Sequence, residues 1–325
     1  MMKAIHVTGQ GGPEVLKLVD VPEPVPLAGT VRIHNRAVAI NFHDIQTRRH
    51  GEAGLTPPFV PGSDFAGIVD AVGPGVQQFR AGDRVLGIHL HGAYAEKSIA
   101  LAALAVKIPE AVSFEQAAAC PVAGLTAYFL VHDLRVGRGT TTLVHAAAGS
   151  VGCFLGGLLR ERGATAIGLV SSPKKAQVAH AAGYAQTIDY RREDVLARIR
   201  EITGGRGVDV VYDSVAGPHF ARSFEACAPE GTVVLFGTAA GEPPLEALAT
   251  GFLGSRRNLG LRTYFLGSTI ERRLAEIPSA YSALFEGLAT GVLRVPIETL
   301  PFAEAAAAQA RIERQETVGK LVLVP

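Results

Sequence analysis

Residues 141–152 read TTLVHAAAGSVG, an apolar run that leads into a glycine turn. The run at 141–145 is typical of a buried strand, and a long apolar segment resumes directly after the turn. In the strand–turn–helix pattern G-x-G-x-x-G, the three glycine positions are held here by Ala147, Gly149 and Gly152. A side chain at the second position would block a pyrophosphate, and one at the third would push the helix off the strand. The turn therefore predicts a pyrophosphate site at a helix N-terminus, with glycine that only eases helix packing as the alternative.

Strands and helices alternate on the C-terminal side of this turn. The expected strands are residues 166–170, 186–189, 208–212 and 232–236, and the expected helices are residues 150–163, 173–182, 194–203 and one that opens at Pro218. Repeated strand–helix units produce a parallel sheet with helices on both faces. We therefore predict a doubly wound α/β (Rossmann) domain.

The first third of the chain has a different pattern. Short strand-like runs separated by glycine and proline predict a small β-barrel domain. Residues 113–116 (SFEQ) and 268–271 (STIE) each have the spacing of a helix capping box. The terminal run 320–324 predicts a strand without a strand–helix neighbour, which we expect to return to the β domain.

Composition excludes several classes of protein. The chain has 325 residues, enough for two domains, and its 31 basic and 30 acidic side chains give a formal net charge of +1. Nucleic-acid-binding proteins usually carry a basic excess, so we expect no nucleic-acid partner. The most apolar window, residues 143–159, is shorter than a membrane span, and three scattered cysteines suit a reducing compartment. We therefore expect a cytoplasmic protein with no membrane partner.

The end of the second strand indicates which cofactor is bound. An NAD site usually places Asp or Glu there to bind the ribose diol, whereas residues 170–175 read VSSPKK. The hydroxyls of Ser171 and Ser172 and the cation of Lys175 suit a 2′-phosphate, so the segment favours NADPH. The alternative is that Lys174 and Lys175 are a solvated pair in the first turn of a helix.

Motifs in a fixed order carry a resemblance to a known family. They are residues 38–44 (VAINFHD), 61–73 (PGSDFAGIVDAVG), 81–85 (AGDRV), 92–96 (GAYAE), 124–128 (GLTAY), 145–152 (HAAAGSVG), 211–215 (VYDSV) and 317–320 (TVGK). Over nearly its whole length the chain resembles the medium-chain dehydrogenase/reductase superfamily, in its zinc-free NADPH:quinone oxidoreductase family. The resemblance implies a GroES-like catalytic domain of residues 1–115 and 290–325, and a Rossmann NADPH-binding domain of residues 116–289.

The resemblance also implies roles for individual residues. Asn41 is expected beside the nicotinamide ribose and the reacting face, and Thr126 near the nicotinamide. The other cofactor-binding residues that it implies are Ala148, Gly149, Ser150, Val151 and Gly152 at the pyrophosphate, Ser171, Ser172, Lys175 and Tyr190 around the 2′-phosphate and its ribose, and Phe236, Gly237 and Lys320 along the rest of the cofactor. Tyr190 could instead be an aromatic residue that packs on the next helix.

Zinc-dependent relatives carry a catalytic cysteine where this chain has Asn41, and a Gly-His-Glu sequence where it has residues 62–64 (GSD). Asparagine and serine are poor zinc ligands, and the close run of cysteines that binds structural zinc is missing, so we expect no metal. His89 and His91 are expected on a loop or at the surface rather than as ligands. An acceptor that is already electron-poor does not need a Lewis acid to take a hydride.

The position of a tyrosine in many relatives is held by Gln46, which we take as the third candidate catalytic residue with Asn41 and Thr126. An amide forms hydrogen bonds but cannot serve as a phenolic acid. Residues 48–50 (RRH) are expected to fill a loop, where they could attract an anionic substrate or simply be solvated.

Together these features predict an NADPH-dependent enzyme that transfers a hydride to a quinone, with a homodimer expected from the family. A double-bond reductase for alkenals, enones or enoyl thioesters is the alternative enzyme. A non-catalytic NADPH-binding accessory protein is the alternative from another class.

Overall fold

The computed structural model describes every residue from 1 to 325, and the chain forms two compact units. The first unit comprises Met1–Leu125, Ile270–Gly291 and Pro296–Pro325, and the second comprises Thr126–Thr269 and Val292–Val295. The sequence had assigned residues 270–289 to the nucleotide-binding domain, yet they belong to the first unit. One contact that places them there is the packing of Leu284 against Gly124, where an added Cβ would lie 2.9 Å from the leucine.

The second unit is built on a parallel sheet of six strands. Its strands are β8 (Thr141–Val144), β9 (Thr165–Val170), β10 (Gln186–Asp189), β11 (Val208–Asp213), β12 (Cys227–Leu235) and β13 (Gly260–Thr263). Their spatial order is β10-β9-β8-β11-β12-β13, and every neighbouring pair is parallel. Order reverses beside β8, as it does in a doubly wound nucleotide-binding sheet, so the predicted fold class is confirmed.

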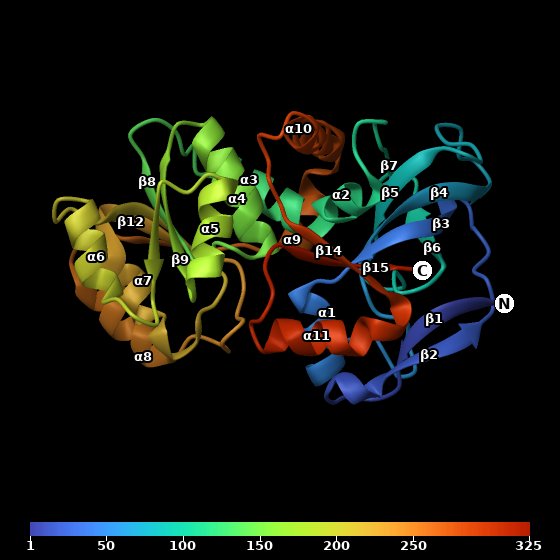
Figure 1. Ribbon diagram of the computed structural model, residues 1–325, viewed down its shortest axis with the longest axis horizontal. Coiled ribbons are helices and arrows are strands. Elements are labelled where there is room, and N and C mark those ends of the chain that lie inside the picture. The colour runs from blue at the N-terminus through green and yellow to red at the C-terminus, as the bar shows by residue number, and fades with distance from the viewer. The chain divides into compact units, whose positions relative to one another are not determined.

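Helices cover this sheet in two layers, as Figure 1 shows. They are α3 (Leu125–Asp133), α4 (Ser150–Glu161), α5 (Pro173–Ala182), α6 (Val195–Ile202), η3 (Gly217–His219), α7 (Ala221–Ala226), α8 (Leu245–Ala247), η4 (Leu248–Phe252) and η5 (Leu253–Ser255). The helix α4 packs against α5, whereas α7 packs against α6 and η4. Apolar side chains from β8, β9 and β11, such as Leu143, Ile167 and Val211, form the core beneath the second layer.

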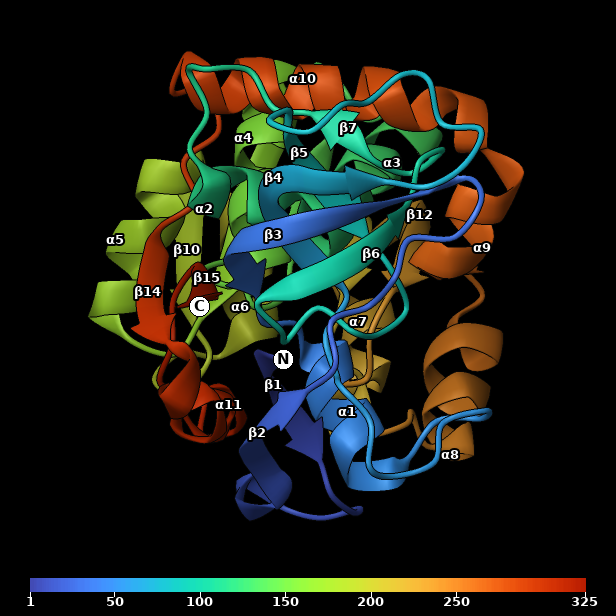
Figure 2. The ribbon, with the colours of Figure 1, turned by 90° about the vertical axis from the view of Figure 1, so that its right-hand side faces the viewer.

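The first unit contains a seven-stranded sheet and a separate hairpin. Its strands are β1 (Met2–Val7), β2 (Leu16–Val21), β3 (Thr30–Ala39), β4 (Asp64–Val72), β5 (Arg84–Ile88), β6 (Lys97–Leu101), β7 (Val106–Lys107), β14 (Ile297–Pro301) and β15 (Lys320–Val324). The order is β14-β15-β3-β4-β5-β7, and β6 pairs with β3, as Figure 2 shows. The helices are η1 (Pro13–Val15), α1 (Phe42–His50), α2 (Phe114–Ala118), η2 (Cys120–Gly124), α10 (Ile277–Ala289), η7 (Phe302–Glu304) and α11 (Ala305–Glu313).

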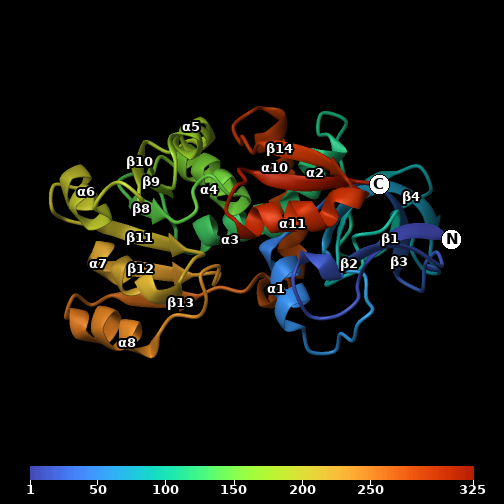
Figure 3. The same cartoon turned by 60° about the horizontal axis from the view of Figure 1, so that its bottom comes forward.

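The last strand returns to the β domain, as predicted, because β15 pairs antiparallel with β3. The expectation that it lacks a strand–helix neighbour is wrong. β15 also pairs in parallel with β14, and the two are joined through α11, which lies along β14 in Figure 3. Strand β14 is mostly exposed or half-buried, so it lacks the apolar alternation by which a strand is recognised in a sequence.

One of the two predicted capping boxes forms. Ser113 accepts a hydrogen bond from the backbone N–H of Gln116, whose side chain accepts from the N–H of Ser113. The second is wrong, because Ser268 lies inside α9 (Leu266–Arg272) rather than at its start. The chain after α9 continues through the short helix η6 (Leu274–Glu276) into α10, which has Pro278 in its first turn. Proline lacks the N–H that a helix interior needs and is tolerated in a first turn.

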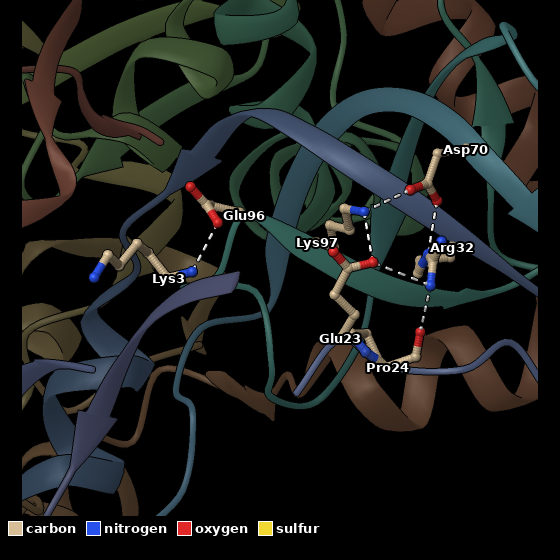
Figure 4. A network of polar contacts seen from close by, with 7 residues as sticks. All are labelled: Lys3, Glu23, Pro24, Arg32, Asp70, Glu96 and Lys97. Carbon is tan, nitrogen blue, oxygen red and sulfur yellow. Dashed lines mark hydrogen bonds and ion pairs between the residues drawn. The ribbon is translucent and has the colours of Figure 1, made fainter. Parts of the chain in front are cut away.

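Charged side chains join strands β3, β4 and β6 on a partly exposed face, as Figure 4 shows. Arg32 Nε lies 2.8 Å from Asp70 Oδ1, and Lys97 Nζ lies 3.2 Å from the other Asp70 oxygen. Lys97 also contacts Glu23 at 2.6 Å, and Arg32 donates to the Pro24 carbonyl at 3.1 Å. These opposite charges on neighbouring strands favour the observed pairing.

No helix has the length and apolar character that crossing a lipid bilayer requires. The three cysteines, Cys120, Cys153 and Cys227, are buried free thiols.

Candidate functional site

The glycine turn forms the predicted strand–turn–helix. β8 ends at Val144, Ala146 adopts a left-handed φ of +50°, and α4 begins at Ser150 with Gly149 as its N-cap. An added Cβ on Gly152 would lie 2.5 Å from the Ala146 carbonyl oxygen, so the helix approaches the turn too closely for any side chain there. The first N–H groups of an α-helix have no acceptor within the helix, which makes this end a site for an anion. The residues predicted to hold a pyrophosphate (Ala148, Gly149, Ser150, Val151 and Gly152) all lie in the turn or the first turn of α4.

A cation and a hydroxyl meet at the carboxyl end of β9. Lys175 Nζ donates to Ser171 Oγ at 3.0 Å, and Ser171 is 7% exposed. Burial, with Arg191 nearby, lowers the pKa of Lys175. A half-buried cation near a second cation would be stabilised by a polyvalent anion, and residues 170–175 contain no carboxylate that would repel one. The structure therefore brings two of the predicted 2′-phosphate residues together and adds Arg191, which sequence reasoning missed.

Two other predicted residues flank this cluster. Ser172 is the N-cap of α5, where its Oγ accepts from the Lys175 backbone N–H at 3.3 Å, so its hydroxyl already has a structural role. Tyr190 directly follows β10, and its backbone N–H donates to the Val170 carbonyl at 3.1 Å. The residue is 44% exposed, so the tyrosine is not a packed core aromatic.

A hollow of about 310 Å³ lies between the ends of β9 and β10. It is lined by Val170, Ser172, Pro173, Ala176, Thr187, Asp189, Arg192 and Glu193. Apolar atoms of Val170, Pro173 and Ala176 and polar atoms of Thr187 and Asp189 share its wall, a composition suited to a planar heterocycle that has polar edges.

Asp213, at the end of β11, organises the next loop and was not recognised as a site residue from the sequence. Its carboxylate is fully buried and accepts from the backbone N–H groups of Val215 and Ala216 at 2.8 and 2.9 Å. Ser223 Oγ donates to the same carboxylate at 2.7 Å, and His145 Nδ1 lies 3.3 Å from it. Burial lowers the pKa of His145 despite the neighbouring Asp213. An aspartate directly after a buried strand was the signal that could have identified this residue.

The loop after β11 also contacts Phe236 and Gly237, which directly follow β12. Phe236 donates its N–H to the Asp213 carbonyl at 2.9 Å, and an added Cβ on Gly237 would lie 2.9 Å from the Ser214 carbonyl oxygen. The Ala239 N–H donates to that Ser214 oxygen at 3.1 Å. These two predicted residues are therefore positioned by the β11 loop.

Asn41 lies in the first unit, as the N-cap of α1, and is 6% exposed. Its backbone N–H donates to Asp44 Oδ2 at 2.8 Å, and that oxygen also accepts from Tyr94 Oη at 2.9 Å. Tyr94 Oη in turn accepts from Gln309 Nε2 at 3.3 Å. Burial raises the pKa of Asp44 to about 6, although both donors favour its charged form. The backbone at Asn41 is thus fixed by a buried carboxyl group.

The Asn41 side chain contacts two residues from other strands. Its Oδ1 accepts a hydrogen bond from Lys320 Nζ of β15, and its Nδ2 donates to Ser63 Oγ at 3.3 Å. Lys320 Nζ also lies 3.7 Å from Asp64 Oδ2 of β4, which accepts the Val122 N–H at 3.1 Å. Burial raises the pKa of Asp64 and lowers that of Lys320. Lys320 was predicted to line the cofactor, but its side chain is 1% exposed and its ammonium group is directed to Asn41.

Zinc does not fit this group of residues. The thiolate and imidazole of zinc-dependent relatives are replaced by the amide of Asn41 and the hydroxyl of Ser63. A bound cation would also be repelled by the Lys320 ammonium, which already lies beside Asp64. In the whole chain, no three His, Cys, Asp or Glu side chains form a group that could hold a metal ion.

The remaining predicted residues lie on helices. Gln46 is half-buried in α1, and Thr126, 6% exposed, lies at the start of α3 in the second unit. The expectation that residues 48–50 fill a loop is wrong, because they end α1. Arg48 is fully buried, where it donates to the Gly11 carbonyl at 3.0 Å and pairs with Glu313 at 2.5 Å, so it does not face a substrate.

Comparisons with known proteins extend over the whole chain. Residues 27–110 match the family described as "Alcohol dehydrogenase GroES-like domain", and residues 182–323 match "Zinc-binding dehydrogenase". The quinone oxidoreductase of Pseudomonas aeruginosa is 38% identical, with all of both chains covered. The solved structure of Escherichia coli quinone oxidoreductase complexed with NADPH superposes with a TM-score of 0.91 at 34% identity, covering 99% of this chain and 100% of that one. A 2-haloacrylate reductase from Burkholderia is 34% identical over 100% of this chain and 99% of its own length.

Proposed function

The chain belongs to the quinone oxidoreductase family of the medium-chain dehydrogenase/reductases, and on that premise we propose that it transfers a hydride from NADPH to a quinone. The observation that carries the choice of cofactor is the contact of Ser171 with Lys175 after the end of β9, with Arg191 close enough to lower the pKa of Lys175. It combines a hydroxyl and two cations at the position where an NAD site would hold a carboxylate. The relative that was solved with NADPH supports the same assignment.

The second unit binds the cofactor through three features. The N–H groups at the start of α4 hold the pyrophosphate, and Gly149 and Gly152 keep the turn free of side chains. Ser171, Lys175 and Tyr190 hold the 2′-phosphate and its ribose. The hollow beside Val170 accepts the adenine ring.

When bound, NADPH supplies the hydride from its dihydronicotinamide ring, and the protein supplies orientation. In the first unit Asn41 and Gln46 each present a side-chain amide, and in the second unit Thr126 presents a hydroxyl; each of these groups can form hydrogen bonds. Phe236 and Gly237 would help to hold the cofactor. No side chain is assigned as an obligatory acid, since the reduced quinone oxygen takes its proton from water. Because zinc does not fit the residues present, no step involves a metal.

A double-bond reductase is the second candidate, and the 2-haloacrylate reductase at 34% identity favours it. An NADPH-oxidation screen of the purified protein against quinones, enones, haloacrylates and aldehydes separates the candidates. We expect kcat/KM to be highest for quinones. Higher values for conjugated double bonds would replace the assignment. Tight NADPH binding without oxidation by any of these acceptors would indicate an accessory protein.

Ser171→Asp tests the cofactor assignment. A carboxylate next to Lys175 would repel a 2′-phosphate and accept hydrogen bonds from a ribose diol. We expect the Kd for NADPH to rise ~100-fold or more while the Kd for NADH stays within about threefold. Ser255→Asp adds the same charge in η5 and serves as the control. Equal effects on both nucleotides would refute the site.

The protein is further proposed to act as a homodimer in the cytoplasm. Leu253 and Phe265 are 75% and 71% exposed, and they flank β13, the edge strand of the parallel sheet. An open edge beside exposed apolar side chains is a surface that a second copy would cover. The three free thiols suit a reducing compartment. Analytical ultracentrifugation should give twice the 34.0 kDa chain mass, and Phe265→Asp should reduce it to one.

A further inference from the structure

We propose that Lys320 and Asp64 are positioning residues: their buried charges hold the Asn41 side-chain amide in one of its two orientations and so prepare the site for hydride transfer. The inference rests on the proposed function, because it takes Asn41 as a group at the reacting face. It assigns Lys320 a role different from direct contact with the cofactor.

The first argument is the energetic cost of the pair. Lys320 and Asp64 are 1% and 0% exposed, and they come from strands far apart in the sequence, β15 and β4. A buried ion pair is often no more stabilising than apolar residues of similar volume. The next residues along β15, Leu321 and Val322, are buried and apolar, so the strand already provides a core without the ammonium. The stability of the fold therefore does not account for these charges.

The second argument is where the ammonium directs its hydrogen bond. Its nitrogen lies 3.7 Å from Asp64 Oδ2, beyond hydrogen-bond distance, whereas it donates directly to Asn41 Oδ1. The other Asp64 oxygen, Oδ1, has no hydrogen-bond partner. The two charges therefore do not form a direct hydrogen bond with each other: the ammonium donates to the Asn41 amide, and Asp64 Oδ2 accepts the Val122 N–H at 3.1 Å.

The third argument is the symmetry of an amide. The Oδ1 and Nδ2 atoms of asparagine are nearly isosteric, and neighbours decide which one points where. The ammonium has only donors, so it can donate to Oδ1 but cannot accept from Nδ2, which instead donates to Ser63 Oγ at 3.3 Å. Ser63 alone would tolerate both orientations, since a hydroxyl both donates and accepts. The α1 capping box also directs the Asp44 backbone N–H to the Asn41 side chain, so Lys320 reinforces the orientation that the helix cap favours.

The charge on Lys320 depends on the groups that face it. Asp64 of β4, Asp44 of α1 and Cys120 of η2 favour the protonated amine, and burial opposes it. Tyr281 of α10, whose hydroxyl has no hydrogen-bond partner, also faces Asp64 and Cys120. Asp64 is the largest of the favourable influences, so it keeps the ammonium charged. Removing its charge should let Lys320 lose its proton at a lower pH.

A readout that needs no turnover comes from the asparagines. The chain has only three, Asn35, Asn41 and Asn258, so selective ¹⁵N-asparagine labelling gives three pairs of side-chain amide signals. We expect one sharp pair from Asn41 in the wild-type protein, assigned with Asn41→Ala. In Lys320→Met this pair should shift and broaden as the amide samples both orientations, while the other two pairs stay in place. An unchanged Asn41 pair would overturn the proposal.

Kinetics of the intact enzyme provide the second readout. We expect Lys320→Met to lower kcat about 100-fold, the scale of a small misplacement at a reacting centre, with the KM for NADPH within about threefold. The double variant Lys320→Met/Asp64→Asn contains no unpaired buried charge. Compared with Lys320→Met, it should therefore regain thermal stability without regaining kcat. Val322→Ala, which destabilises the same strand, should leave kcat unchanged. Recovery of kcat together with stability in the double variant would mean that the pair is only structural.

The pH profile separates positioning from a general loss of structure. For both proteins kcat is measured as a function of pH. In Asp64→Asn, the fall in kcat should occur at a pH at least one unit lower than any fall in the wild type. A profile parallel to the wild type would contradict the inference. If wild-type protein reduces no quinone, the proposed function fails while the amide spectra still report on Asn41. If quinones are reduced and Asn41→Ala keeps full kcat, only the role of Asn41, and with it this inference, fails.

Discussion

Replacing Asp44 by asparagine should change how the stability of the protein depends on pH. Asp44 is 2% exposed, and burial raises its pKa from 3.8 to about 6. A carboxyl group whose pKa is higher in the folded chain binds its proton more tightly there than when unfolded. Its contribution to stability is therefore fully present below pH 4 and is lost as the pH rises through 6.

The magnitude follows from the shift. About two pKa units at 1.36 kcal/mol each give roughly 3 kcal/mol that Asp44 removes from the free energy of unfolding between pH 4 and pH 7. An asparagine at this position keeps an oxygen that can accept from the Asn41 N–H and from Tyr94 Oη, but it never ionises. The variant should therefore gain on the wild type by up to about 3 kcal/mol over this range.

Urea unfolding followed by far-ultraviolet circular dichroism at half-unit steps from pH 4 to 7 measures the difference between the two proteins. Subtracting one curve from the other removes the groups that both proteins share. Asp20→Asn, which removes a carboxylate whose side chain is 57% exposed, serves as the control for loss of a surface charge. A flat curve for Asp44→Asn, or one in which the variant loses stability with rising pH, would refute the reasoning. The latter result would mean that its two donors outweigh the burial of the charge.

Three further outcomes are expected. Gly152→Ala would place a Cβ 2.5 Å from a turn carbonyl, so it should lower stability by about 1–3 kcal/mol and weaken NADPH binding in a fluorescence titration, whereas Gly137→Ala, with 3.7 Å of clearance, should do neither. Although burial raises the pKa of Asp70, its two basic neighbours outweigh burial and lower it, so Asp70→Asn should cost up to ~1 kcal/mol in urea unfolding at pH 7, and the cost should vanish as the pH falls below 4. Arg191→Gln should raise the Kd for NADPH about 5- to 10-fold and leave the Kd for NADH unchanged, because one cation near the 2′-phosphate is lost.

Much of the second unit could be predicted from local sequence. The strand expected at residues 186–189 is β10 with the same bounds, and the helix expected to stop at Gly183 ends at Ala182 with that glycine as its C-cap. Parallel strands are buried on both faces, so their sequences are short apolar runs. Glycine or proline marks where the helices between them start and end.

The first unit was harder because its elements depend on distant partners. β14 is a half-exposed strand that is stabilised by pairing with β15 after an intervening helix, and nothing local marks it. Arg48 looked like an exposed basic residue, but the partner that allows it to be buried, Glu313, lies at the other end of the chain. The effect of the charge added by Ser171→Asp can instead be predicted locally, because Ser171 directly follows strand β9.

The residues of the candidate site also fall into two groups, those placed by local sequence and those placed by distant partners. Gly149, Gly152, Ser171 and Lys175 are close in sequence to the strands that place them, and their roles could be proposed from spacing. The contact of Lys320 with Asn41 joins positions 41 and 320, and no spacing rule links them. Asp213 is intermediate between these two groups of residues. The sequence shows that it follows an expected strand, but it does not show the contacts of Asp213 with His145 and Ser223.

Asn41 is held through two different atoms, which distinguishes the two perturbations proposed for it, and Asp44 contributes to both because its charge also favours the protonated Lys320. Its backbone N–H is fixed by Asp44, which ionises near pH 6, whereas its side-chain amide is oriented by Lys320 through a different atom. Asp44→Asn keeps an acceptor for the backbone and leaves the ammonium in place, so it should alter the pH dependence of stability while kcat at pH 7 stays close to the wild-type value. Lys320→Met keeps the helix cap and removes the orienting charge, so it should alter kcat at every pH. If the two variants instead changed kcat in parallel, backbone and amide would form one structural unit, and the distinction between capping α1 and orienting Asn41 would have to be abandoned.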